Sequence, residues 1–214
     1  MKKITVLILC LVGICTHSIS YAFSFSEEEE QEKAQAVKAT KRIKRMLAVP
    51  CAAELKNKTI ALMIGEYGNH GRVKSVGSSY GMHFQMINTR LRKLGLKTMT
   101  QVQITERVAQ EEMEAVLNND PDAALSAAER LGAQFILRGV IRARSRVNPI
   151  VRTNEVFVNM GFSLSGSDGR PISDVSASGD SWAGMDTLSI SLDIVREQAG
   201  GVVARLYRDY CTSH

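Results

Sequence analysis

The sequence has little that could hold the protein in a membrane. Its longest apolar run, residues 4–16, follows two lysines and is shorter than the roughly 20 residues that a helix needs to cross a bilayer. Ser20 and Ala22 are small residues at the two positions that a signal peptidase reads. The pattern predicts a cleaved export signal over residues 1–22 and a mature chain that begins near Phe23.

A lipoprotein signal is also missing, because such a signal needs a small residue just before the modified cysteine. Ile14 precedes Cys15, and Leu9 precedes Cys10. We therefore expect a periplasmic protein without a lipid anchor, and without a transmembrane segment once the signal is removed.

Basic residues only slightly outnumber acidic residues in the sequence. The chain of 214 residues has a formal net charge of +5, and loss of Lys2 and Lys3 with the signal would lower it to +3. A nucleic-acid-binding protein would show a stronger basic balance or a recognisable motif, and the sequence has neither. We expect no nucleic-acid partner.

Cysteine is scarce, since the chain has four and only Cys51 and Cys211 follow the signal. An even number in an oxidising compartment predicts a disulfide, and two separate buried thiols are the alternative. In the chain-entropy model a loop of about 160 residues would stabilise the fold by up to about 5 kcal/mol.

The glycine-rich segment 63–83, MIGEYGNHGRVKSVGSSYGMH, lacks the spacing of a nucleotide or metal site. Its glycines do not form the G-x-x-x-x-G-K-[ST] loop that cradles phosphates. His70 and His83 have no partners at metal-ligand spacing. We therefore expect no metal ion and no cofactor.

One catalytic motif does match this segment. Gly77, Ser79 and Gly81 fit the G-x-S-x-G elbow of serine hydrolases, which lies between a strand and a helix. Residues 73–76 are barely a strand, and His83, one helical turn from the serine, is awkwardly placed as the base of a triad. An exported serine hydrolase using Ser79 is therefore the alternative to the function we expect, a non-catalytic binding protein.

A charged amphipathic helix is predicted at residues 26–48, within an N-terminal unit of residues 23–50. Four glutamates open it and lysines and arginines close it, which suits the helix dipole at both ends. Its basic end is either exposed to solvent or in contact with anionic lipid or wall polymer.

Residues 51–214 predict one folded domain, whose first part alternates strands and helices. The apolar run at 59–64 indicates a strand covered on both faces. We then expect a helix at 82–95, a short strand at 96–100, a helix at 105–117 and a helix at 120–132.

The rest of the domain predicts a three-stranded antiparallel meander and a final helix. Residues 133–147 and 152–165 alternate apolar and polar side chains, and the Asp-Gly pair at 168–169 indicates a hairpin before a strand at 172–183. The tail from Asp186 fits a strand or a helix, and its longer periodicity favours the helix. The expected fold class is α+β, with a single mixed β-sheet packed with helices.

Two places hold polar residues that packing does not explain. One is a row of arginines on the strand at 133–147, which either pairs with Glu155, Asp174 and Asp180 or docks an acidic partner. The other is the loop after the first strand, since exposed loops commonly carry binding residues. The candidate binding residues are Glu66, Tyr67, Asn69, His70, Arg72, Arg138, Arg142, Arg144 and Arg146.

Roughly residues 58–208 resemble a family of periplasmic domains. Residues 128–139, AERLGAQFILRG, are similar to that family's helix that runs through Leu-Gly-Ala into a strand. Leu164 followed by residues 168–172, DGRPI, is similar to its hairpin. The family comprises the curli secretion channel subunit (CsgG), LpoB-type activators of penicillin-binding proteins, the N-terminal domain of TolB and the flagellar protein FlgT.

This resemblance implies a non-catalytic periplasmic binding or assembly protein of the bacterial cell envelope. The chain lacks the lipobox of the curli and LpoB proteins and the strand-forming insertions of a curli pore, so a role like that of TolB or FlgT fits better. The implied partners are envelope proteins of a wall-synthesis, flagellar or secretion assembly, and self-association stays open.

Overall fold

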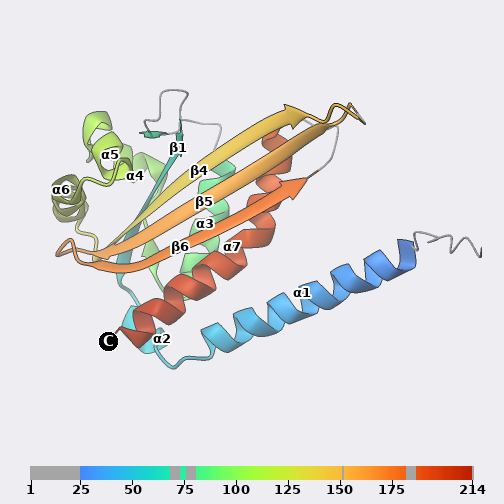
Figure 1. Cartoon of the computed structure of the whole chain (residues 1–214). Helices are drawn as coiled ribbons and strands as arrows, with labels where there is room; N and C mark the ends of the chain where they lie inside the picture. The colour runs from blue at the N-terminus through green and yellow to red at the C-terminus, as the bar shows by residue number, and fades with distance from the viewer. Residues whose placement is uncertain (1–24, 68–72, 76–80, 151, 182–186, 214) are drawn as a thin grey trace, which may run out of the picture. The chain divides into compact units, whose positions relative to one another are not determined.

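The computed structural model describes residues 25–67, 73–75, 81–150, 152–181 and 187–213. They form an α+β fold with one mixed sheet, in which the strand order is β2-β1-β4-β5-β6 and β3 pairs with β1 (Figure 1). The elements are α1 (Phe25–Leu47), α2 (Ala52–Leu55), β1 (Thr59–Tyr67), β2 (Val73–Ser75), α3 (Gly81–Lys93), β3 (Lys97–Thr98), α4 (Gln101–Thr105), α5 (Gln110–Leu117), α6 (Pro121–Leu131), β4 (Phe135–Val147), β5 (Asn154–Gly166), β6 (Pro171–Ser181) and α7 (Thr187–Thr212).

The chain divides into two units, Met1–Val37 and Lys38–His214, and the sheet lies in the second. The described part of the first unit is the beginning of α1. No helix in the described ranges is both long and apolar enough to cross a membrane.

The sheet has the mixed pairing that the sequence predicted. β1 runs parallel to β4, and its buried residues Ile60 and Leu62 lie beside Phe135 and Leu137. A parallel pair needs a long crossover, which the segment from β2 to α6 supplies. β4, β5 and β6 then form the expected antiparallel meander.

One face of the sheet carries the apolar core. Ile141, Met160 and Ala177 lie side by side on β4, β5 and β6, and alternation places most other apolar residues of these strands, such as Leu137 and Phe162, on the same face. Helices α3 and α7 cover this face (Figure 1). The tail that fitted two patterns is therefore the helix α7, whose apolar side, including Val195 and Val202, is fully buried.

The opposite face is covered at one end only. Helices α4, α5 and α6 lie beside β1 and the beginning of β4 (Figure 1), where Met63 and Ile136 are buried. Farther along the meander, Arg144, Asn159 and Ser176 on this face are exposed. The fold thus leaves a long surface of β4, β5 and β6 open.

Two local predictions were wrong. The helix expected at 105–117 is two helices, because Thr100 and Gln103 form a capping box that starts α4 earlier and α5 begins only after Ala109. Glu66 and Tyr67 were expected in a loop, but β1 continues through them because it pairs there with β2, a strand that the sequence barely indicated.

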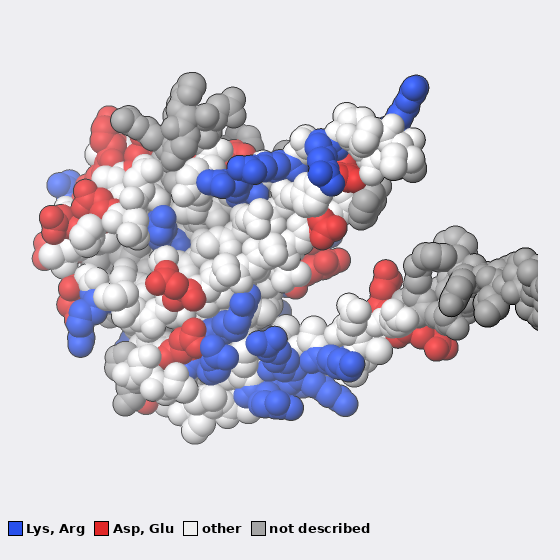
Figure 2. Space-filling view, in the orientation of Figure 1, with Lys and Arg blue, Asp and Glu red and all other residues white. Residues whose placement is uncertain are grey.

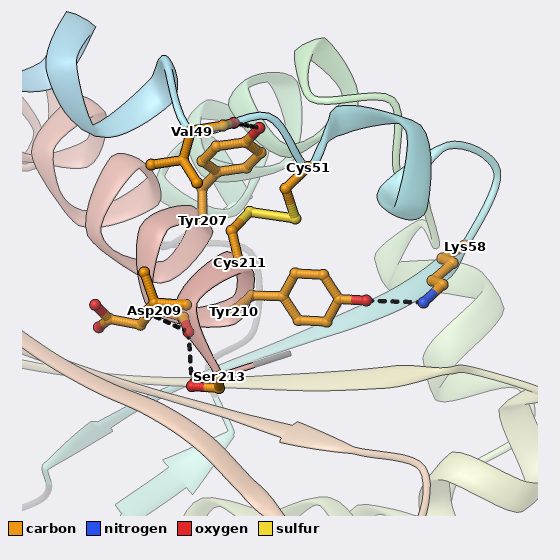
Figure 3. The surroundings of a disulfide bond; sticks show 9 residues. Val49, Cys51, Lys58, Tyr207, Asp209, Tyr210, Cys211 and Ser213 are labelled. Atoms are coloured by element: carbon orange, nitrogen blue, oxygen red, sulfur yellow. Dashed lines mark hydrogen bonds between the residues drawn. A yellow bond between two sulfur atoms is a disulfide. The ribbon is translucent and has the colours of Figure 1, made fainter.

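The predicted disulfide between Cys51 and Cys211 is present, with the Cα atoms 5.6 Å apart (Figure 3). Hydrogen bonds join the same two regions of the chain. The hydroxyl of Tyr207 donates to the carbonyl of Val49 at 2.6 Å, and the ammonium of Lys58 donates to the hydroxyl of Tyr210 at 2.8 Å. The start of the folded domain is thereby fastened to the end of α7.

Candidate functional site

The four arginines of the predicted row lie on the open face of the sheet. They occupy even-numbered positions of β4, so their side chains point away from the α3 and α7 layer. Figure 2 shows basic side chains that follow β4, an uncharged strip beside them, and acidic side chains on the side of β6. The row consists of Arg138, Arg142, Arg144 and Arg146.

Arg138 stands where the helices stop covering this face. Its Nε donates to the carbonyl of Leu117 at 2.8 Å, and its Nη1 donates to Asn119 Oδ1 at 3.3 Å and to Ser163 Oγ at 3.4 Å. Burial lowers the pKa of Arg138, and the charges of Tyr67 and Asp174 act to raise it. These contacts hold the guanidinium in one position at the edge of the open surface.

Ser163 extends this polar contact across the sheet. It lies opposite Arg138 on β4 and opposite Asp174 on β6. Its hydroxyl donates to the Asp174 carboxylate while it accepts from Arg138. Arg138, Ser163 and Asp174 therefore form a connected row across three strands.

Arg142 links the arginine row to the end of β1. Its guanidinium carbon lies 3.9 Å from the centre of the Tyr67 ring, which is a close cation–π contact. Tyr67 and Arg142 were singled out separately in the sequence, on different elements. The structure brings these two together. The half-buried Glu66 precedes Tyr67 in β1 and lies opposite Ile141, so alternation directs its side chain to the other face of the sheet.

Arg146 has a carboxylate partner at the far end of β4. It lies opposite Glu155 in the strand register and pairs with it, as one interpretation of the row predicted. Arg142 and Arg144 have no carboxylate in an ion pair within the described part of the chain. Internal pairing therefore accounts for only part of the row.

Glu155 is a buried acid, with 2% of its side chain exposed. A hydrogen bond from the Asn148 side chain, 2.7 Å long, and another from Arg146 lower the pKa of Glu155 below its ordinary 4.5. The carboxylate on β5 is thus held in its charged form by the end of β4 and the turn that follows it.

This pKa shift makes stability depend on pH. Because the folded-state pKa lies below the unfolded-state value, the contribution of Glu155 is complete above pH 4.5 and is lost as the pH falls through the folded-state pKa. We expect Glu155→Gln to lower the melting temperature at neutral pH and to reduce the further loss between neutral pH and about pH 3. Thermal unfolding of both proteins across this range checks the prediction, and parallel curves would contradict it.

Two hollows lie on the open face, one on each side of the row formed by Arg138, Ser163 and Asp174. The larger, of about 470 Å³, extends toward Tyr67 and Arg142, and the smaller, of about 290 Å³, extends toward the α5–α6 end. We call the surface of the larger hollow the trough. Its floor consists of Val140, Asn159, Gly161, Ser163 and Ser176.

The trough is wide and shallow, unlike the enclosed pockets that bury most of a small ligand. Its small floor residues leave the strand surface accessible over the two strand spacings from β4 to β6, which is about 10 Å. Such a surface suits an extended or helical protein segment.

Asn69, His70, Arg72 and the alternative nucleophile Ser79 lie outside the described residues, and His83 is fully buried on α3. Within the described ranges, no three metal-ligating side chains cluster. The sequence prediction did not include Asn159, Gly161, Ser163 and Ser176, although their alternation with the apolar residues of β5 and β6 indicates an uncovered face.

No protein-family model matches the sequence, and no curated protein matches it. Among solved structures, the PelC dodecamer from Paraburkholderia phytofirmans is similar over 71% of this chain and 87% of that chain, with 14% identity and a TM-score of 0.42. Lipoprotein GNA1162 from Neisseria meningitidis is similar over 66% and 96%, with 13% identity and a TM-score of 0.43. The LpoB C-terminal domain from Salmonella enterica is similar over 64% and 91%, with 15% identity and a TM-score of 0.36. Similarity at this level neither places the chain in a family nor gives it a function.

Proposed function

We propose that this chain is a non-catalytic binding protein of the bacterial periplasm, and that its trough holds a segment of an envelope protein. The observation that carries the proposal is the uncovered face of β4, β5 and β6. Along one side of it lie two arginines, Arg142 and Arg144, that form no ion pair with a carboxylate of the described residues. The export signal predicted at residues 1–22 and the disulfide support an oxidising location outside the cytoplasm. The sequence resemblance to the CsgG, LpoB and TolB N-terminal domains agrees with this role.

The charges of the trough indicate what kind of segment fits. Arg142 lines the β4 side of the trough and Asp174 its β6 side. The exposed side chains of Arg144 and Asp180 lie farther along the same face of these two strands. A bound segment with acidic side chains toward β4 and basic side chains toward β6 would complement both rims. Arginine and tyrosine are also the residue types that most often dominate the energy of protein interfaces, and Arg142 and Tyr67 are already stacked.

Photo-crosslinking in the native host tests this function. A photoreactive residue at Ser176, in the floor of the trough, should give a discrete cross-linked protein, while the same residue at Thr89, exposed on α3, should not. Arg142→Glu combined with Arg144→Glu should strongly reduce the product, because charge repulsion replaces attraction.

The matched control reverses two exposed cations elsewhere, Lys93→Glu with Lys97→Glu, and should leave the product unchanged. The melting temperature of each variant shows whether the fold is intact. Equal cross-linking from Ser176 and Thr89, or no effect of the arginine reversal in a folded protein, would refute the trough as the binding site.

A further inference from the structure

The β4–β5 hairpin ends in an exposed apolar tip beyond the trough. Val147 is 62% exposed and Ile150 is 88% exposed, and Pro149 between them is exposed as well. Ile150 has the highest exposed fraction of the large apolar residues in the described chain. The residues of this tip do not pack against the core, so burial in the fold does not explain their apolar character.

Hydrogen bonds join the described residues of the tip to one another and to β5. Asn148 Oδ1 accepts a hydrogen bond of 2.9 Å from the Ile150 N–H, and Asn148 Nδ2 donates to the buried Glu155 at 2.7 Å. Backbone hydrogen bonds of 2.9 Å also join Asn148 to Arg152 and to Thr153. Arg152 has a φ of +54°, a backbone conformation that residues other than glycine rarely adopt. Asn148 thus links the backbone of Ile150 to Glu155 on β5, and such ordering before binding favours binding.

Cationic side chains precede and follow the apolar tip along the hairpin. Arg144, Arg146 and Arg152 are all exposed, and Arg146 also lies over the Phe157 ring, 5.1 Å from its centre. The acid of the hairpin nearest to the tip is Glu155, which is buried and bound by Arg146 and Asn148. The end of the hairpin thus combines an apolar apex with a basic collar.

We propose that this tip enters the headgroup region of an anionic phospholipid bilayer. Apolar side chains at an apex gain from partial burial at the boundary of headgroups and acyl chains, and nearby arginines gain from anionic lipid phosphates. A protein partner is less suited to the same feature, because a convex apex of three residues is far smaller than the surface of a stable protein interface. The hairpin would hold the trough close to the membrane surface.

Fluorescence of a tryptophan at the apex tests the insertion directly. In the purified protein, Trp182, the only tryptophan, is changed to phenylalanine and Ile150→Trp is added. Vesicles of phosphatidylcholine with phosphatidylglycerol should shift the emission to the blue, and vesicles of phosphatidylcholine alone should not. An unshifted emission with the anionic vesicles would overturn the proposal.

Vesicle co-sedimentation then separates the roles of apex and collar. Ile150→Asp should weaken binding to the anionic vesicles by about tenfold or more, because it removes the apolar apex and adds a negative charge. Arg144→Gln with Arg152→Gln should weaken it by roughly tenfold, and added salt should weaken binding of the unaltered protein.

The control is Val102→Asp, a change at another apolar residue that is 62% exposed, on α4. Binding should be unchanged in this variant. An equal loss with Val102→Asp, or no preference of the unaltered protein for anionic vesicles, would overturn the proposal. The proposal would also be overturned if the unaltered protein did not bind vesicles and Ile150→Asp instead removed the protein cross-link formed from Ser176.

Discussion

Replacing both Cys51 and Cys211 with alanine is expected to lower the free energy of unfolding by up to about 5 kcal/mol. The bond joins residues 160 positions apart, so it closes nearly the whole folded domain into one loop and removes much of the freedom of the unfolded chain. Cys51 is also buried, and its removal loses packing against the core. Urea unfolding of the oxidised protein and of the double variant measures the difference.

Reduction provides the control for this prediction. The unaltered protein in reductant should approach the stability of the double variant, and the variant itself should not respond to reductant. If the variant is as stable as the oxidised protein, the bond does not stabilise the fold.

Gly139→Ala is expected to destabilise the protein by about 1–3 kcal/mol through overpacking. A Cβ atom at this position would lie 2.7 Å from Cε1 of Phe162 and 3.3 Å from Cγ1 of Ile64. Phe162 is fully buried on the neighbouring strand and has no space to move away. Thermal or urea unfolding of the single variant measures the effect.

Gly161→Ala is the matched control, because Gly161 lies on the adjacent strand and faces the trough. A Cβ atom there would have no other atom within 4 Å, so the change should stay within about 0.5 kcal/mol. Equal effects of the two substitutions would mean that strand glycines matter for their backbone, and not for the contact between Gly139 and Phe162.

Patterns local in sequence predicted most of the fold. Alternation along residues 133–147 and 152–165 was enough to place the two long strands and their buried faces, because each strand has one covered and one open side. The helix from Asp120 to Gly132 was also predictable, since Asp120 accepts hydrogen bonds from the first turn and Gly132 has the left-handed conformation that ends a helix.

Non-local pairing caused the error at the end of β1. The extension of β1 through Glu66 and Tyr67 depends on β2 and β4, and no pattern within residues 59–67 reports those partners. The floor of the candidate site escaped prediction for the same reason. Gly161, Ser163 and Ser176 are small residues of types that are common in loops. They form an exposed surface only because α4, α5 and α6 do not extend over them.

The disulfide also decides how the domain would carry a mechanical load. A pull on the chain before Cys51 would pass through the covalent bond to Cys211 and into α7, whose length packs on the meander. β1 lies inside the closed loop and would bear little of that tension. Consider a force that pulls a partner bound in the trough away from the chain before Cys51. That force would pass through the sheet, α7 and the disulfide, and it would not unfold the domain progressively from its N-terminal end.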